Sequence, residues 1–169
     1  MEKSSVEAIA NTLNAAAVRY LIAGGLAVVA HGYVRFTADL DVIIDLEPAN
    51  VGRAVAALSQ LGYQPRAPVG LSEFADPKKR AMWVREKGLT VFSLYSPEHP
   101  ATEIDLFVEL PLDFEHAYAG AARIDVAPGV PATFIGLDDL LRLKQQAGRP
   151  QDLLDIEKLR ALQRTRTDA

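Results

Sequence analysis

Two aspartates separated by one residue, Asp39 and Asp41, begin the alternating segment DLDVIID. In an extended strand, such residues leave the same face, about 6 to 7 Å apart along the chain. Two carboxylates at this spacing can share a hard cation such as Mg2+, which prefers oxygen ligands and usually also binds substrate phosphates. The spacing alone equally fits an exposed strand face that simply carries charge.

A third aspartate, Asp105, lies among alternating apolar residues in the predicted strand 103–109. The alternation places Asp105 on the face opposite its apolar neighbours. With Asp39 and Asp41 it would complete a carboxylate set for two-metal, phosphoryl-type transfer. Its expected role is to deprotonate or orient the attacking hydroxyl. The predicted metal-binding and catalytic residues are therefore these three aspartates.

Two glycines, Gly24 and Gly25, separate the apolar run 20–23 from a helical segment, 26–31. Backbone N–H groups at a turn before a helix can receive phosphate oxygens. The same glycines could instead simply permit a tight turn. Because the carboxylate pair follows, the turn favours a site where a nucleoside triphosphate and its metal meet at one sheet edge.

Two cationic residues are further candidates for nucleotide binding. Arg35 precedes Asp39 by four residues, and its guanidinium could form forked contacts with phosphate or a salt bridge with Asp39 or Asp41. Lys144 shares the predicted inward face of a helix with three leucines, so it either snorkels to solvent or points into the site.

Other charged residues are interpreted as structural. Asp152 and Asp155 are explained by helix-start charge and by ion pairs with Arg149 and Lys158. The three histidines show no metal-ligand spacing, and His31 is read as a packing residue. Two basic stretches are interpreted as solvated surface: Lys78, Lys79, Arg80, Arg85 and Lys87, and Arg160, Arg164 and Arg166.

Composition limits the class of protein. A chain of 169 residues with 49% apolar content predicts one folded domain, 1–169. It has no cysteine for a disulfide or a thiolate metal site, which fits a reducing compartment. No apolar run is long enough for a membrane span, so we expect a cytoplasmic protein. The net charge of −4 gives no general attraction to nucleic acid, so we expect no reading of DNA grooves and only local RNA contact.

Hydrophobic periodicity predicts alternating helices and strands around these groups. Segment 63–100 holds five prolines and is expected to be substrate-facing, with a hairpin of 81–84 and 90–94. Ser4 and Glu7 fit a capping box. The expected helices are 4–17, 26–31, 48–61, about twelve residues after Gly136, and one ending near 163; the expected strands are 20–23, 40–46 and 103–109.

The stretch GGLAVVAHGYVRFTADLDVIID, residues 24–45, resembles the signature of the nucleotidyltransferase superfamily, in which a GG or GS turn precedes an Asp-x-Asp pair. The likeness is to minimal nucleotidyltransferases of the AbiEii/AbiGii toxin-like type, and it extends to LLRLKQQAGRPQDLLDIEKL. It implies an α/β (α+β) nucleotidyltransferase fold, a mixed β-sheet flanked by helices with a C-terminal helical hairpin at about 136–163. It also implies triphosphate binding by Gly24 and Gly25, metal binding by Asp39 and Asp41, a third carboxylate at Asp105, and a late lysine, matched by Lys144, that assists triphosphate binding.

The implied activity is Mg2+-dependent transfer of a nucleoside monophosphate from a triphosphate such as ATP to an acceptor. The acceptor would be a tRNA or protein in a toxin–antitoxin or phage-defence setting, with a cognate antitoxin as partner. A small hydroxyl compound is the alternative, because lincosamide nucleotidyltransferases share the GG turn, the Asp-x-Asp pair and the compact size. Many active members carry Gly-Ser at the turn, whereas Gly25 offers only backbone. A non-catalytic member that binds nucleotide or a partner protein is therefore also expected as an alternative.

Overall fold

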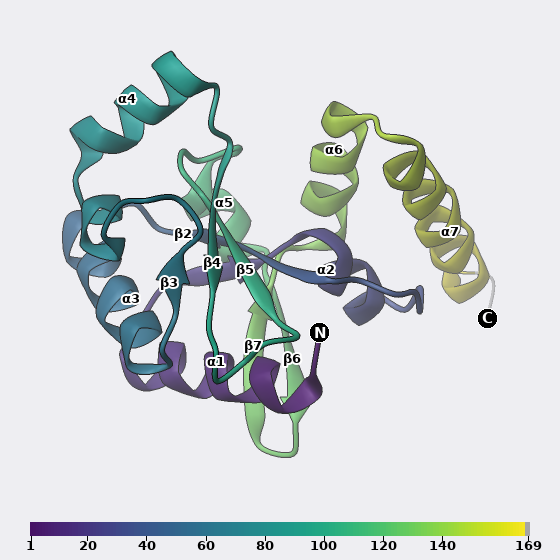
Figure 1. The fold of residues 1–169 in the computed structure, drawn as a ribbon. Coiled ribbons are helices and arrows are strands. Elements are labelled where there is room, and N and C mark those ends of the chain that lie inside the picture. Colours follow the sequence, from purple (N-terminus) through teal and green to yellow (C-terminus); the bar gives the residue numbers. More distant parts are fainter. Residues whose placement is uncertain (168–169) are drawn as a thin grey trace.

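A seven-stranded mixed sheet with the strand order β3-β4-β5-β2-β1-β7-β6 organises the chain (Figure 1). The computed structural model describes residues 1–167. The strands are β1 Tyr20–Ile22, β2 Asp39–Ile44, β3 Gln64–Pro65, β4 Val91–Tyr95, β5 Glu103–Phe107, β6 Ala122–Ala127 and β7 Val130–Phe134.

Helices flank the sheet, and the last two form a pair that extends from one end of it (Figure 1). Helix α1 packs against α3 and the β6–β7 hairpin, whereas α6 contacts α2 and α7. None of the helices described combines the length and apolar composition needed to cross a bilayer. The helices are α1 Lys3–Ala15, α2 Gly24–Ala30, α3 Pro48–Gln60, α4 Pro77–Lys87, α5 Phe114–Ala119, α6 Leu137–Ala147 and α7 Pro150–Thr167, with a 3-10 helix at Leu71–Ala75.

The central strand β2 follows the predicted alternation. Leu40 and Val42 are at most 1% exposed, whereas Asp39 is exposed and Asp41 is half-buried on the other face. Strand β2 pairs in parallel with β5, and this register sets Asp41 opposite Asp105. The apolar face of β2 therefore anchors the strand in the core while its aspartates stay available to solvent.

The predicted hairpin of 81–84 with 90–94 is wrong. Residues 77–87 form helix α4, and only 91–95 form a strand, which pairs with β3 and β5. Asp76 caps this helix by accepting from the Lys78 N–H at 2.8 Å, and Gly88 ends it in the left-handed conformation. Pro77 at the first position and Gly88 after the last are the usual helix start and stop signals, so the glycine is a C-cap and not a hairpin turn.

Two further differences separate the predicted elements from the observed ones. Helix α1 begins at Lys3 without a side-chain cap, so the capping box predicted at Ser4 and Glu7 does not form. Between residues 110 and 135, where no element was expected, the structure holds α5 and the β6–β7 hairpin. The hairpin extends the sheet because β7 pairs in parallel with β1, with Ile22 opposite Phe134.

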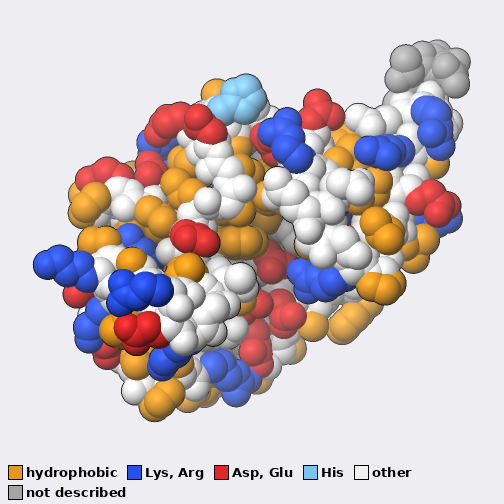
Figure 2. Space-filling view, turned by 90° about the horizontal axis from the view of Figure 1, so that it is seen from above, with side chains coloured by type: hydrophobic (Ala, Val, Ile, Leu, Met, Phe, Trp, Pro, Cys, Tyr) orange, Lys and Arg blue, Asp and Glu red, His pale blue; other side chains and the backbone are white. Residues whose placement is uncertain are grey.

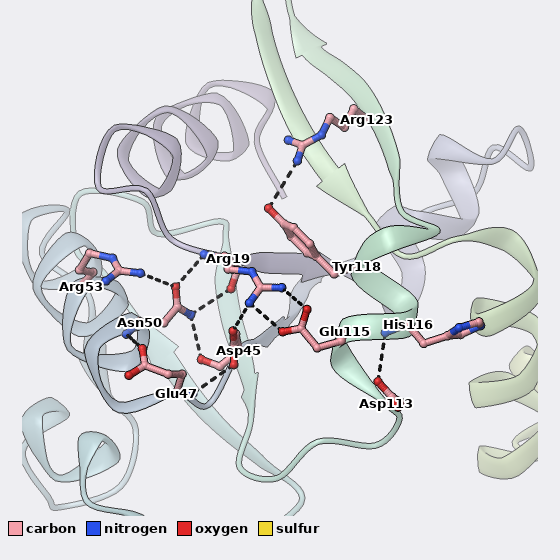
Figure 3. A network of polar contacts seen from close by, with 10 residues as sticks. All are labelled: Arg19, Asp45, Glu47, Asn50, Arg53, Asp113, Glu115, His116, Tyr118 and Arg123. Atoms are coloured by element: carbon pink, nitrogen blue, oxygen red, sulfur yellow. Dashed lines mark hydrogen bonds and ion pairs between the residues drawn. The ribbon is translucent and has the colours of Figure 1, made fainter.

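A polar network joins β1 and β2 to α3 and α5 (Figure 3). The buried Asn50 side chain accepts from the Arg19 N–H at 2.8 Å and donates to the carbonyls of Arg19 and Asp45 at 3.1 and 2.8 Å. The Arg19 guanidinium pairs with Asp45 at 2.7 Å and Glu115 at 2.8 Å and lies over the Tyr118 ring. Asp45, two residues after Ile43 on the face of Asp41, is thus a structural partner of Arg19.

Replacing Asn50 with Ala should lower the free energy of unfolding by about 2 to 4 kcal/mol, because it leaves one buried N–H and two carbonyls without their partner. Urea unfolding followed by circular dichroism measures the change. Gln60→Ala, an exposed substitution at the end of the same helix and outside the network, should stay within about 0.5 kcal/mol of wild type. A variant at Asn50 that is as stable as the Gln60 control would show that the network does not hold these strands.

Candidate active site

A cleft of about 480 Å3 lies between the strands β2 and β5 and the helices α6 and α7. Figure 2 shows a face of the molecule that is hollowed beside the C-terminal helices, with acidic side chains in the hollow. Every site residue predicted from the sequence lines this cleft: Gly24, Gly25, Arg35, Asp39, Asp41, Asp105 and Lys144.

The three predicted aspartates come from two adjacent parallel strands. Asp41 lies opposite Asp105, and Asp39 lies two residues earlier on the same face of β2. Ser93 Oγ, from β4, donates to Asp105 Oδ1 at 2.5 Å and so fixes one oxygen of this carboxylate. The structure therefore brings together side chains that are 64 and 66 residues apart in the sequence.

The pKa values of Asp39 and Asp41 are raised, first by burial and then by neighbouring carboxylates. Burial raises the pKa of Asp41 to about 6, with further contributions from Asp105 and Asp39, while Lys144 and the Gly25 N–H act in the opposite direction. Burial also raises the pKa of Asp39, and the nearby Asp105 and Glu103 carboxylates add to this effect. Like charges held this close favour a proton or a cation between them.

The donor set suits a hard divalent cation, since it consists of carboxylate oxygens that repel one another. Within residues 1–167, however, no group of three or more His, Cys, Asp or Glu side chains is clustered tightly enough to hold a metal ion by itself. Asp41 and Asp105 face each other, whereas Asp39 is displaced along β2. These carboxylates fit a Mg2+ ion whose ligand set is completed by substrate phosphates and water, as is usual for this ion.

The glycine turn is shaped by close contact with the carboxylates. Gly24 has a φ of +57°, and a Cβ added to it would lie 1.8 Å from Asp41 Oδ2. The Gly25 N–H donates to the Asp41 carboxylate, so an anionic oxygen already sits at the turn. Only glycine allows both the backbone conformation and this approach at position 24.

Thr37 is a cleft residue that the sequence analysis did not identify. A Cβ added to Gly25 would lie 2.2 Å from Thr37 Oγ1, so the threonine occupies the space of a side chain at position 25. A serine at position 25 would therefore require the Thr37 side chain to shift. The available signal was the position of Thr37, two residues before Asp39.

The two predicted cations line the cleft, and both pair with aspartates of helix α7. Arg35 forms a two-pronged ion pair with Asp155, at 2.8 Å for both contacts, and not with Asp39 or Asp41. Lys144 is 6% exposed and pairs with Asp152 at 2.9 Å and Asp155 at 2.8 Å, so it does not snorkel to solvent.

The prediction of purely local ion pairs in α7 is correct only in part. Asp152 does pair with Arg149, at 3.2 Å. Asp155 pairs with Arg35, which is 120 residues away, while Lys158 contacts Glu157 instead. Sequence spacing could not show this, because it reports neighbours along a helix and not across the fold.

The histidines hold structural contacts. A ring nitrogen of His31 lies 2.8 Å from the Ile135 carbonyl oxygen, which agrees with a packing role. His99 lies 3.0 Å from Ser5 Oγ and stacks on Tyr63. Neither histidine lines the cleft.

Comparison with known proteins establishes the fold. No family model and no curated protein sequence matches the chain. Among solved structures, the antibiotic-resistance factor ANT(2'')-Ia, an aminoglycoside nucleotidyltransferase, superimposes with a TM-score of 0.51 over 99% of this chain and 95% of its own, at 16% identity. The chain has the nucleotidyltransferase fold. The predicted mixed sheet, flanking helices and C-terminal helical hairpin are thus confirmed, while the AbiEii/AbiGii-like subtype stays a prediction.

The raised pKa of Asp41 gives a signed pH dependence. Its folded-state pKa of about 6 exceeds the ordinary value of 3.8, so ionisation destabilises the fold. The destabilisation is absent below about pH 4, grows as the pH rises, and is complete above about pH 6, where it amounts to roughly 3 kcal/mol. Without divalent cations, Asp41→Asn should therefore be more stable than wild type at pH 8 and equal to it at pH 4. Urea unfolding across this range tests the expectation, which a pH-independent difference would contradict.

The close approach of Gly24 to Asp41 predicts that alanine destabilises the fold more at position 24 than at position 88, although the two glycines have similar φ. Gly88 has a φ of +60° with no atom within 4 Å of an added Cβ, so Gly88→Ala should cost about 1 kcal/mol from the backbone conformation alone. Gly24→Ala should cost at least about 2 kcal/mol more, because the Asp41 side chain must move. Equal losses in urea unfolding would mean that the contact between Gly24 and Asp41 is not constrained.

Proposed function

We propose that the protein is a Mg2+-dependent nucleotidyltransferase that transfers a nucleoside monophosphate from a triphosphate to an acceptor hydroxyl and releases pyrophosphate. The observation that carries the proposal is the convergence of Asp39, Asp41 and Asp105 with the Gly24–Gly25 turn in one cleft. The likeness of the whole chain to ANT(2'')-Ia supports it at the level of the fold.

The charges around the cleft support a requirement for a divalent cation. Five carboxylates and three cationic side chains surround it, counting the buried Asp155 behind the wall: Asp39, Asp41, Asp105, Asp152 and Asp155 against Arg35, Lys144 and Arg149. Such a cleft is net negative and would repel a free triphosphate. Bound Mg2+ would supply charge neutralisation and a template for the phosphates.

Each side chain has a role in the proposed reaction. Asp39 and Asp41 would hold the metal, and Arg35 and Lys144 would contact the triphosphate. Asp105, with one oxygen fixed by Ser93, would accept the proton of the attacking acceptor hydroxyl or orient that hydroxyl. The oxygen of the acceptor forms the new bond to the α-phosphorus, and the bond to pyrophosphate breaks. Catalysis would thus consist mainly of positioning and charge neutralisation.

The sequence leaves two classes of acceptor open. A tRNA or protein acceptor follows from the AbiEii/AbiGii-like resemblance, with an antitoxin as partner. A small hydroxyl compound is favoured by the match to an antibiotic-resistance factor and by a cleft volume of about 480 Å3, which is in the range of small-molecule sites. The resistance-factor match therefore makes the small acceptor the second candidate function.

The test is transfer of label from each α-32P nucleoside triphosphate with Mg2+, in the presence of bulk tRNA or of hydroxylated antibiotics. Asp41→Asn should reduce transfer by about a hundredfold or more, because it removes a metal-facing charge. Asp138→Asn removes one exposed carboxylate from α6, outside the cleft, and should transfer label like wild type.

The label's destination and two binding measurements separate the alternatives. Label on tRNA supports the toxin-like acceptor, and label on an antibiotic supports the small one. Mg2+-dependent nucleotide binding without any transfer would indicate a non-catalytic member. If Mg2+ does not raise the melting temperature of wild type at pH 8, and no triphosphate binds, the proposed function is wrong.

A further inference from the structure

Asp155, in the second turn of α7, is a fully buried carboxylate with several donors around it. Its Oδ1 accepts from Arg35 Nε at 2.8 Å and from Gln151 Nε2 at 3.0 Å. Its Oδ2 accepts from Arg35 Nη2 and from Lys144 Nζ, each at 2.8 Å. A carboxylate held this way has one orientation, and it ties the segment before β2 to both C-terminal helices.

The pairing with Asp155 determines which side of the Arg35 guanidinium faces the glycine turn. Asp155 takes the Nε and Nη2 edge. The remaining nitrogen, Nη1, donates to the Phe36 carbonyl at 2.8 Å and lies 3.3 Å from the place of a Cβ on Gly25. Because the guanidinium is a rigid plane, fixing one edge also fixes the other.

Lys144 is oriented by the same helix. Its Nζ contacts Asp152 Oδ1 at 2.9 Å and Asp155 Oδ2 at 2.8 Å. Asp152 is itself held by the backbone N–H of Arg149 at 3.3 Å. An ammonium group has three donors, so these two contacts leave one for the cleft that Lys144 lines.

We propose that Asp155, supported by Asp152, is a positioning residue. It holds the Arg35 guanidinium and the Lys144 ammonium side by side on the cleft wall, where they receive a nucleoside triphosphate. The inference rests on the proposed function and adds the residue that arranges its two cations. Asp155 is 0% exposed and does not line the cleft, so it acts through Arg35 and Lys144 and not by contact with substrate.

If Asp155 acted through its charge alone, its removal would change triphosphate affinity in the opposite direction from the loss of a positioning residue. A negative charge behind two cations weakens their attraction for an anionic ligand, so its removal would tighten triphosphate binding if the cations kept their places. If the cations need Asp155 for their orientation, its removal weakens binding. The sign of the change in affinity therefore distinguishes positioning from charge alone.

The experiment is calorimetric titration of the full chain with ATP, GTP, CTP and UTP in the presence of Mg2+. Asp155→Asn keeps the side-chain size and should raise the Kd of the best-bound triphosphate about tenfold, the effect of losing one charge-assisted contact. Asp152→Asn, which leaves the Arg35 pair intact, should raise the Kd by a smaller factor. Glu157→Gln removes the same charge from an exposed position on α7 and should leave the Kd unchanged.

Urea unfolding of each variant gives the folded fraction, because a buried asparagine at position 155 leaves Arg35 without its charged partner and Lys144 with Asp152 alone. The double variant Arg35→Gln/Asp155→Asn removes one cation together with the carboxylate and so limits this loss. With Arg35 already replaced, the added Asp155→Asn change should raise the Kd by a smaller factor than it does in wild type, because one of its two targets is gone.

Three results would overturn the inference. The first is equal or tighter triphosphate binding by folded Asp155→Asn. The second is an undiminished effect of Asp155→Asn when Arg35 is already Gln. The third, a wild-type protein that binds none of the four triphosphates, overturns the proposed function as well, so the two failures are distinguishable.

Discussion

The parallel pairing of β2 with β5 forces like charges together. The register that buries Leu40 and Val42 also sets Asp41 opposite Asp105, because alternate residues share a face. The apolar face supplies the stability, and the polar face carries the electrostatic cost. Burial raises the pKa of Asp41, the charges of Asp105 and Asp39 raise it further, and a carboxylate in this environment is receptive to a cation.

The remainder of the cleft is arranged around this concentration of negative charge. Gly24 has no side chain, so the turn can approach Asp41, and the Gly25 N–H gives the carboxylate a donor. Lys144 partly compensates the charge of Asp41 from α6. The C-terminal helices therefore complete the cleft electrostatically as well as sterically, and the cations reach it through contacts with Asp152 and Asp155.

Local patterns made part of this arrangement predictable. The alternation around Asp39 and Asp41 encodes a strand face directly, and Pro48 and Gly62 mark helix α3. The convergence of Asp105 with Asp41 was expected from the resemblance, but the register depends on pairing between distant strands. The contact of Arg35 with Asp155 was not predictable, since no local spacing encodes a contact across 120 residues. Helix α4 differs from the predicted hairpin because Gly88 is a helix C-cap, and the signals Asp76 and Pro77 mark the start of that helix.

Gly25 stands where many active nucleotidyltransferases carry a serine, and this difference bears on whether the cleft is catalytic. A glycine where serine is common looks like the loss of a hydroxyl when only the sequence is considered. In the structure, Thr37 Oγ1 lies 2.2 Å from the place of a Cβ on Gly25, so the two positions share one space. A serine at 25 would require the Thr37 side chain to shift, so the glycine agrees with the local packing. Gly25 alone therefore does not decide between catalysis and binding, and that decision rests on the carboxylates.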